Sequence, residues 1–247
     1  DNTDDYLGSS EIVALPNGNF VVASEDDNVG GLANAGSVML VNGTTGAVIA
    51  NFTGDKADDE LGGRDIDSLG NNNFVIASED DDLGASGDDE GSVMLVNGTT
   101  GALIKTITGD KANDYIGNKG IKALYLTNTN DGVATNNYNF VVVSSQDNVG
   151  GVDDAGSVML VNGTTGAVIA TISGDDDDDH LGSSGVEVLS NGNFVVASDE
   201  DNVGVVSNAG SVMLVNGKTG AVIATISGDN TDDQLASSDM DVLANDN

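Results

Sequence analysis

The stretch SVMLVNGTTGAVIATISGD, residues 157–175, occurs in four near copies along the chain and decides its fold. The other copies lie at 37–55, 92–110 and 211–229. Divided at the Gly-Asp pair that ends each copy, one repeat domain of residues 1–247 is expected, with repeats 1–54, 55–109, 110–174 and 175–228 and a partial fifth repeat, 229–247. Repeats of 54 to 65 residues are longer than most helical repeats and suit a propeller blade of four strands.

Each repeat reads as four strands joined by turns and one loop. In the fourth repeat the predicted strands are 185–189, 194–198, 211–215 and 221–226. Asn-Gly turns at 190–193 and 216–220 join the first pair and the last pair, and an acidic, glycine-bearing loop joins the middle strands. The sequence therefore predicts an all-β β-propeller built from repeated four-stranded antiparallel blades. An open stack of the same β-meander repeats is the alternative.

The second strand of each repeat is an almost continuous apolar run, such as Phe194-Val195-Val196-Ala197. Such a run predicts a strand covered on both faces, which blades stacked face to face would provide. The methionines of the third strands are expected to pack in the same core: Met39, Met94, Met159 and Met213. The third repeat is the exception, because its first turn expands to residues 125–139. The insertion is either neutral loop drift or the place of an added function.

The charge of the chain disfavours several classes of partner. It has 41 Asp and Glu against 7 Lys and Arg, a formal net charge of −34. Nucleic acid is therefore not an expected partner, because phosphate binding needs a basic face, and anionic membranes are disfavoured for the same reason. No apolar run approaches the ~20 residues that span a bilayer, so no direct membrane insertion is expected. There is no cysteine for a disulfide or a thiol site.

A family resemblance begins at Asp5-Tyr6-Leu7-Gly8. This motif, followed by a strand, an Asn-Gly-Asn turn, a second strand and Gly36-Ser37-Val38-Met39, resembles the FG-GAP repeat of integrin alpha chains and their bacterial relatives. The same order recurs from Asp59, Asp114 and Asp179, so the resemblance covers all four repeats. It implies a β-propeller on an extracellular or cell-surface protein that acts in adhesion. The family's Asp-x-Asp-x-Asp-Gly calcium loop is missing from the first turn here, so that site is not carried over.

Carboxylates gather at two places in each repeat. The junction between repeats has Asp at its first and fifth positions, and the loop between the second and third strands has one recurrent Asp. Clustered carboxylate oxygens suit Ca²⁺, whereas softer metals are disfavoured by the absence of Cys and the single His. The alternative is a solvated acidic surface that keeps molecules apart. The candidate metal ligands are Asp1, Asp5, Asp27, Asp55, Asp59, Asp81, Asp110, Asp114, Asp147, Asp175, Asp179, Asp201, Asp229 and Asp233.

Two further local signals are weak. Four Asn residues match the glycosylation pattern, namely Asn42, Asn51, Asn97 and Asn162. All except Asn51 are also good residues for the turn between the third and fourth strands, and turn chemistry is the favoured interpretation. His180 lies in a run of Asp residues and is expected to be solvated rather than catalytic.

The function expected from the sequence is non-catalytic. No phosphate loop precedes a helix, no base lies near the recurrent serines, and the many carboxylates are not distinctive enough to indicate a carbohydrate-active enzyme. We expect an extracellular or cell-surface calcium-binding module that serves adhesion or structural assembly. Its partner would be a protein or glycan surface ligand, or copies of itself as the polymerising building block of a surface layer, sheath or filament.

The partial fifth repeat duplicates the start of the chain. Residues 229–238 and the expected strand 239–243 match residues 1–15. Three explanations are open: the natural chain continues into a fifth repeat, the spare strand pairs head to tail with a neighbouring molecule, or it closes the array locally.

Overall fold

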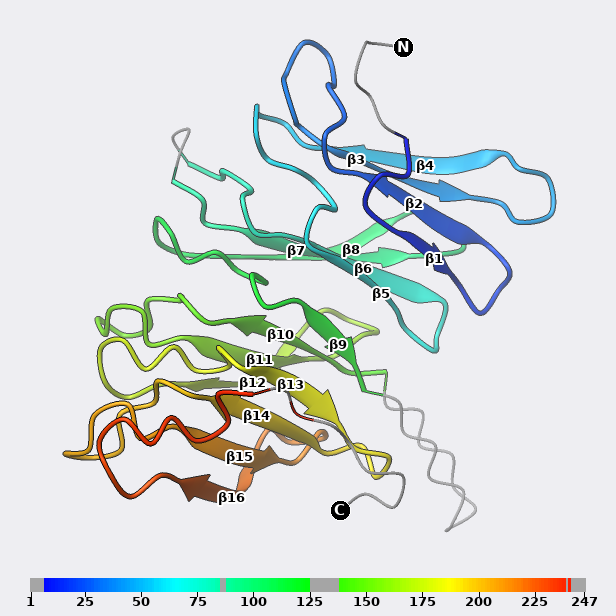
Figure 1. Ribbon diagram of the computed structural model, residues 1–247. Helices are drawn as coiled ribbons and strands as arrows, with labels where there is room; N and C mark the ends of the chain where they lie inside the picture. Colours follow the sequence, from blue (N-terminus) through cyan, green and yellow to red (C-terminus); the bar gives the residue numbers. More distant parts are fainter. Residues whose placement is uncertain (1–6, 85–87, 125–137, 239, 241–247) are drawn as a thin grey trace. The chain divides into compact units, whose positions relative to one another are not determined.

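The fold is all-β, in a computed structural model that describes residues 7–84, 88–124, 138–238 and 240. These residues form four antiparallel sheets of four strands each, and no helix occurs among them (Figure 1). No helix in the described part of the chain is long and apolar enough to cross a membrane. The expected insertion at 125–139 lies mostly outside the described residues, as does the expected strand 239–243 apart from residue 240.

The strands follow one another as four meanders. The first sheet has β1 (Ile12–Ala14), β2 (Phe20–Ser24), β3 (Ser37–Val41) and β4 (Val48–Thr53). The second has β5 (Asp65–Ser68), β6 (Asn73–Ser78), β7 (Ser92–Asn97) and β8 (Leu103–Thr108). The third has β9 (Ile121–Ala123), β10 (Phe140–Ser144), β11 (Ser157–Val161) and β12 (Val168–Ser173). The fourth has β13 (Gly185–Val188), β14 (Phe194–Ser198), β15 (Ser211–Val215) and β16 (Val222–Ser227).

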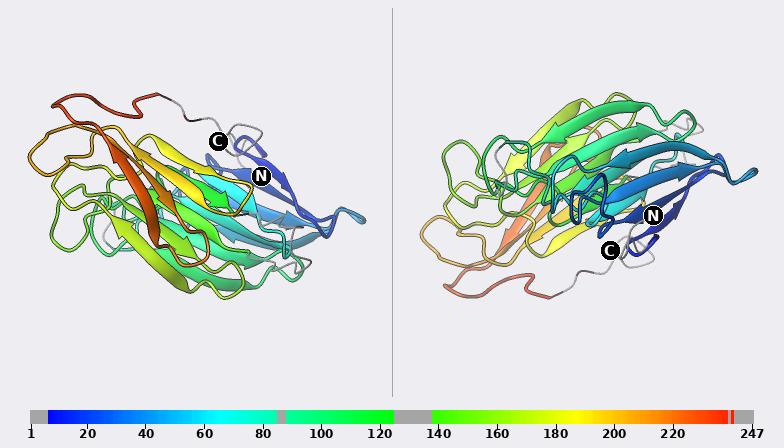
Figure 2. Two further views of the ribbon diagram at one scale, coloured as in Figure 1. Left: turned by 90° about the horizontal axis from the view of Figure 1, so that it is seen from below. Right: turned by 90° about the horizontal axis from the view of Figure 1, so that it is seen from above.

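Each sheet has its strands in sequence order, so the prediction of four-stranded antiparallel blades is confirmed. In the fourth sheet, β14 and β15 begin and end where the sequence predicts, and β13 and β16 agree within one residue. The strands of a sheet run side by side in both views of Figure 2. The third and fourth strands of every sheet share one register shift, between Leu214 and Val215 in the fourth.

The chain divides into two compact units, residues 1–121 with 163–166 and residues 122–162 with 167–247. In each unit two sheets bury apolar side chains between them. We call the face of a sheet that packs on the following repeat its trailing face, and the opposite face its leading face. In the second unit the trailing face of β9–β12 supplies Val141, Val143, Val158 and Leu160, and the leading face of β13–β16 supplies Val186, Phe194, Val196 and Val215. The first unit repeats this core with Val21, Ala23, Val38 and Leu40 against Ile66, Phe74, Ile76 and Val96.

Burial follows the expectation from the apolar runs. Every residue of β6 and β10, the second strands of their repeats, is buried. Met159 is buried, and Met94 and Met213 are partly buried against the two cores, as expected for core methionines. The fourth strand is the least covered, and all of β16 is exposed.

The turns explain the recurrent asparagines. Asn216 Oδ1 accepts hydrogen bonds from the backbone N–H groups of Lys218 and Thr219, and Asn42 and Asn97 do the same in their turns. Asparagine at this position is therefore explained by turn chemistry. The turn between the first two strands reaches the following repeat: the Nδ2 groups of Asn17 and Asn19 donate to Gly98 O at 3.0 and 2.9 Å.

Candidate metal centre

The fifth junction Asp closes its own loop. Asp59 Oδ2 accepts hydrogen bonds from the backbone N–H groups of Asp55 and Lys56, at 2.8 and 2.7 Å. Its other oxygen accepts from Asp82 N at 3.3 Å, which ties the junction to the loop between β6 and β7. Asp179 makes the corresponding three bonds in the fourth repeat, to residues 175, 176 and 202. The recurrence of this Asp therefore has a structural cause that needs no cation, which weakens recurrence alone as an argument for a metal.

Two repeats bring three predicted ligands together. Asp55, Asp59 and Asp81 each place one carboxylate oxygen within 4.8 Å of the others, and so do Asp175, Asp179 and Asp201. In both groups the first two residues come from the junction and the third from the loop after the second strand. We call them the second-repeat triad and the fourth-repeat triad. Such a set of hard oxygen donors can coordinate a divalent cation.

The electrostatics of the triads disfavour leaving them ionised without a counter-charge. Burial raises the pKa of Asp59, although backbone hydrogen bonds oppose the rise. Burial also raises the pKa of Asp81 and Asp201, and the charges of their triad partners add to the shift. A bound cation would reverse this balance, because an opposite charge nearby favours the ionised carboxylate.

The two triads differ in local charge. In the second repeat the ammonium of Lys56 contacts the carbonyl oxygens of Asp82 and Gly84. Asp176 occupies the corresponding position in the fourth repeat, where its charge raises the pKa of Asp201 further. Beside the fourth-repeat triad there is therefore an additional carboxylate, whereas beside the second-repeat triad there is a lysine ammonium.

A buried serine lies next to Asp201 of the fourth-repeat triad. Ser211 is 1% exposed, and its Oγ has no hydrogen-bond partner among the described residues, although its hydroxyl lies close enough to Asp201 to oppose the rise in pKa. The corresponding serines of the first and third repeats, Ser37 and Ser157, donate to Asp27 and Asp147 at 2.5 Å. Ser211 thus places a buried hydroxyl beside Asp201.

A pocket adjoins the second-repeat triad. Its volume is about 260 Å³, and the three triad carboxylates line it together with Ser92 and Met94. The pocket is large enough for a cation with water ligands. It gives this triad access from solvent.

The other predicted ligands are not grouped in this way. Asp110, Asp114 and Asp147 form no such triad within the described residues. Asp27 bonds Ser37, and the ligands expected beside it, Asp1 and Asp5, lie outside the described residues. Asp229 and Asp233 belong to the partial repeat. Asp233 is exposed, and backbone hydrogen bonds from Asn230 and Asp229 lower its pKa.

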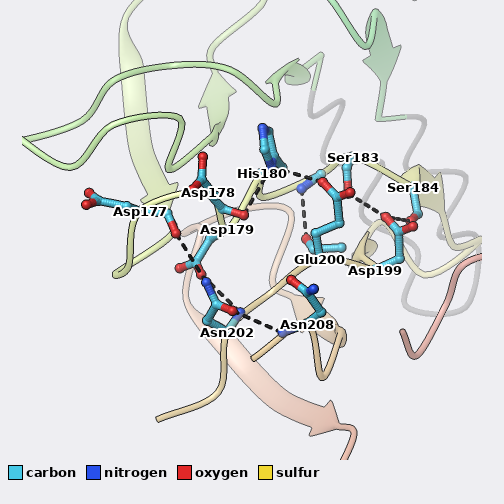
Figure 3. Close-up of polar contacts among 12 residues, drawn as sticks. Asp177, Asp178, Asp179, His180, Ser183, Ser184, Asp199, Glu200, Asn202 and Asn208 are labelled. Carbon is cyan, nitrogen blue, oxygen red and sulfur yellow. Dashed lines mark hydrogen bonds and ion pairs between the residues drawn. The ribbon is translucent and has the colours of Figure 1, made fainter. Parts of the chain in front are cut away.

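A third group was not predicted from the sequence. Asp154, Asp178 and His180 place ligand atoms within 4.8 Å of one another. The side chain of His180 is 26% exposed, and its Nδ1 lies 3.0 Å from both Glu200 Oε2 and Asp178 O (Figure 3). Recurrence gave no signal for this group, because the position of His180 holds Glu60 and Tyr115 in other repeats.

The same close-up shows the hydrogen-bond partners of the serines that lie near His180. The hydroxyls of Ser183 and Ser184 both donate to Asp199 Oδ1, at 2.8 and 2.9 Å, and His180 faces Glu200 instead (Figure 3). Among the residues drawn, no serine is therefore hydrogen-bonded to the histidine as an activated nucleophile would be.

Fold and site together define a repeat protein of four-stranded antiparallel blades with acidic junctions. The chain belongs to the family of a repeat of unknown function (DUF5650), which matches it four times, at residues 14–62, 68–118, 134–176 and 188–231. No curated protein matches the chain. The crystal structure of BamB from Moraxella catarrhalis is similar, with 12% sequence identity and a TM-score of 0.47. The similarity covers 88% of this chain and 48% of that one, so the chain spans about half the length of BamB. The FG-GAP resemblance stays a prediction.

Proposed function

We propose that the protein is a non-catalytic, extracellular or cell-surface blade module that binds Ca²⁺ at its junctions and serves adhesion or structural assembly. The observation that carries the cation is the fourth-repeat triad, where three carboxylates converge and the buried Ser211 hydroxyl lies beside Asp201. The FG-GAP resemblance supports the location and the adhesive role. A protein or glycan surface ligand is the partner that such a role implies.

Calcium suits these junctions better than other metals. The donors of both triads are oxygen atoms, which favours a hard cation. Their loops already hold Asp59 and Asp179 through backbone N–H groups, so the carboxylates are positioned before a cation arrives. Pre-positioned ligands lower the entropy cost of binding.

The test is calorimetric titration of the whole chain with Ca²⁺, together with thermal unfolding in Ca²⁺ and in chelator. Ca²⁺ should raise the melting temperature, because it binds the folded state alone. Asp81→Asn and Asp201→Asn should each reduce the increase. Asp26→Asn, which removes one charge outside both triads, should leave it unchanged. Equal melting temperatures in Ca²⁺ and chelator would establish the solvated acidic surface instead.

An alternative within the same proposal is a polymerising building block of a surface layer, sheath or filament. An adhesin would stay monomeric when Ca²⁺ is added and only become more stable, whereas a building block would change its oligomeric state. Sedimentation velocity with and without Ca²⁺ separates the two. A carbohydrate-active enzyme has no specific support in the arrangement of carboxylates.

A further inference from the structure

Within the second unit, no sheet formed by described residues packs on the trailing face of the fourth sheet. Ile226 in β16 is 67% exposed, whereas the corresponding Ile172 of β12 is partly buried against the core of the second unit. Val212 and Leu214 in β15 are likewise partly exposed, although their counterparts in β11 are buried. This face therefore carries the apolar residues that pack between consecutive sheets elsewhere in the chain, but here they are exposed or partly exposed to solvent.

The leading face of the first sheet shows the complementary feature. Ile12 in β1 is 66% exposed, whereas the corresponding Val186 of β13 is 4% exposed. Phe20 is partly exposed, and its counterpart Phe194 is fully buried. The first sheet therefore presents the apolar residues that a trailing face covers elsewhere in the chain.

Polar groups match across the same two faces. Within each unit, asparagines of one first turn donate to a glycine carbonyl of the next repeat: Asn17 and Asn19 to Gly98, and Asn139 to Gly217. The corresponding donors of the fourth sheet are the Nδ2 groups of Asn191 and Asn193, which donate to no described residue. The corresponding acceptor of the first sheet is Gly43 O.

Backbone shape matches as well. In the second unit, Gly220 approaches the fourth strand of the preceding sheet so closely that an added Cβ would lie 2.2 Å from Ala170 Cβ. The first unit has the same approach of Gly101 to Ala50, at 2.3 Å. The corresponding glycine of the first sheet, Gly46, has nothing within 4 Å of such an atom, and the corresponding alanine, Ala224 in β16, is exposed.

We propose that the trailing face of β13–β16 binds the leading face of β1–β4 in a second copy of this chain. The contact is heterologous, so it propagates head to tail and leaves the same two faces free at the ends of each assembly. This deepens the structural arm of the proposed function and does not require the Ca²⁺ sites. The partner is a second copy because its first sheet supplies every matching group: the apolar face, the Gly43 carbonyl and the open Gly46.

The start of the partial fifth repeat determines which residues of the second copy can take part in the contact. Leu235 N donates to Ala209 O at 3.0 Å, as Leu181 N does to Ala155 O at 2.9 Å within the second unit. Leu235 therefore already holds the position on the fourth sheet that corresponds to Leu7 of an incoming copy. The incoming copy contributes its sheet through Ile12 and Phe20, and Leu7 stays outside the contact.

The test uses the full chain with one face changed at a time. Ile226→Asp places a charge on the trailing face, Ile12→Asp places one on the leading face, and Val205→Asp changes a loop valine that is 99% exposed and lies on neither face. Sedimentation velocity is measured over a range of protein concentration, in chelator and at a salt concentration that screens repulsion between the acidic copies.

The unchanged chain and Val205→Asp should form concentration-dependent oligomers, and each face variant alone should stay monomeric. A mixture of the two face variants should form a complex of one copy of each and stop there, because only one intact pair of faces remains. Monomers under all conditions, or no complex in the mixture, would overturn the proposal. If Ca²⁺ binding persists in that case, the failure concerns assembly alone and the proposed cation site stands.

Discussion

At the scale of the residue, glycine in the last turn of a repeat is set by close packing inside one sheet. A Cβ on Gly217 would lie 1.8 Å from Gly192 O in the turn between β13 and β14. Gly43 has the same relation to Gly18 O in the first sheet. The two turns at one end of a blade therefore touch through backbone atoms, and any side chain separates them.

Gly217→Ala should lower the free energy of unfolding by about 1–3 kcal/mol, the usual range for overpacking. Urea unfolding measures this loss. Lys218→Ala changes the exposed neighbouring residue and should stay within about 0.5 kcal/mol of the unchanged protein. Equal stabilities for the two variants would contradict the close approach of the turns.

The second junction residue should set the Ca²⁺ affinity of each triad. Asp176→Lys copies the residue of the second repeat into the fourth and should weaken binding there, because it replaces a carboxylate with a competing ammonium. Lys56→Asp makes the reverse exchange and should strengthen binding at the second-repeat triad. Calorimetric titration of both variants checks the pair, and shifts in the same direction would contradict this assignment.

At the scale of the element, strands and turns could be predicted because their signals are local. Apolar alternation and the Asn-Gly turns located β13 to β16 to within one residue. The Asn17 to Gly98 bond, which joins residues 81 positions apart, has no local signal. Recurrence singled out the carboxylates that the second- and fourth-repeat triads bring together, but it marked Asp110, Asp114 and Asp147 of the third repeat equally, and these form no triad within the described residues. The loop-closing role of Asp59 could not be predicted, because recurrence alone does not separate a hydrogen-bonded carboxylate from a metal ligand.

The asparagines of the first turn should contribute to holding consecutive sheets together. Asn17→Ala and Asn19→Ala remove two donors to Gly98 O, and each should cost about 1 kcal/mol of unfolding free energy. Asn191→Ala removes the corresponding residue of the fourth sheet, whose Nδ2 donates to no described residue. It should cost less in monomeric protein. Equal losses at all three positions would show that the effect is confined to each turn.

At the scale of the whole molecule, a net charge of −34 makes stability depend on protons and cations together. The raised pKa values of Asp59, Asp81 and Asp201 mean that the cation-free folded state binds protons more readily than the unfolded chain. Stability without Ca²⁺ should therefore rise as the pH falls from neutral towards the ordinary Asp value of 3.8.

Saturating Ca²⁺ should reverse this dependence. Carboxylates that hold a cation must lose their protons, so the Ca²⁺-bound folded state binds fewer protons than the unfolded chain, and its stability falls as the pH falls. Urea unfolding across the acid range, in Ca²⁺ and in chelator, measures both slopes. Slopes of the same sign in the two series would count against carboxylate ligation.

The matched faces of the blades also have a consequence for the gene. In each unit a trailing face packs on a leading face of the following sheet, and the two contacts use apolar residues at corresponding positions. We expect that an unequal crossover that duplicates one whole repeat would add a sheet whose faces are of the kinds that already pack together inside each unit. Such a duplication would change the number of blades without a new kind of interface.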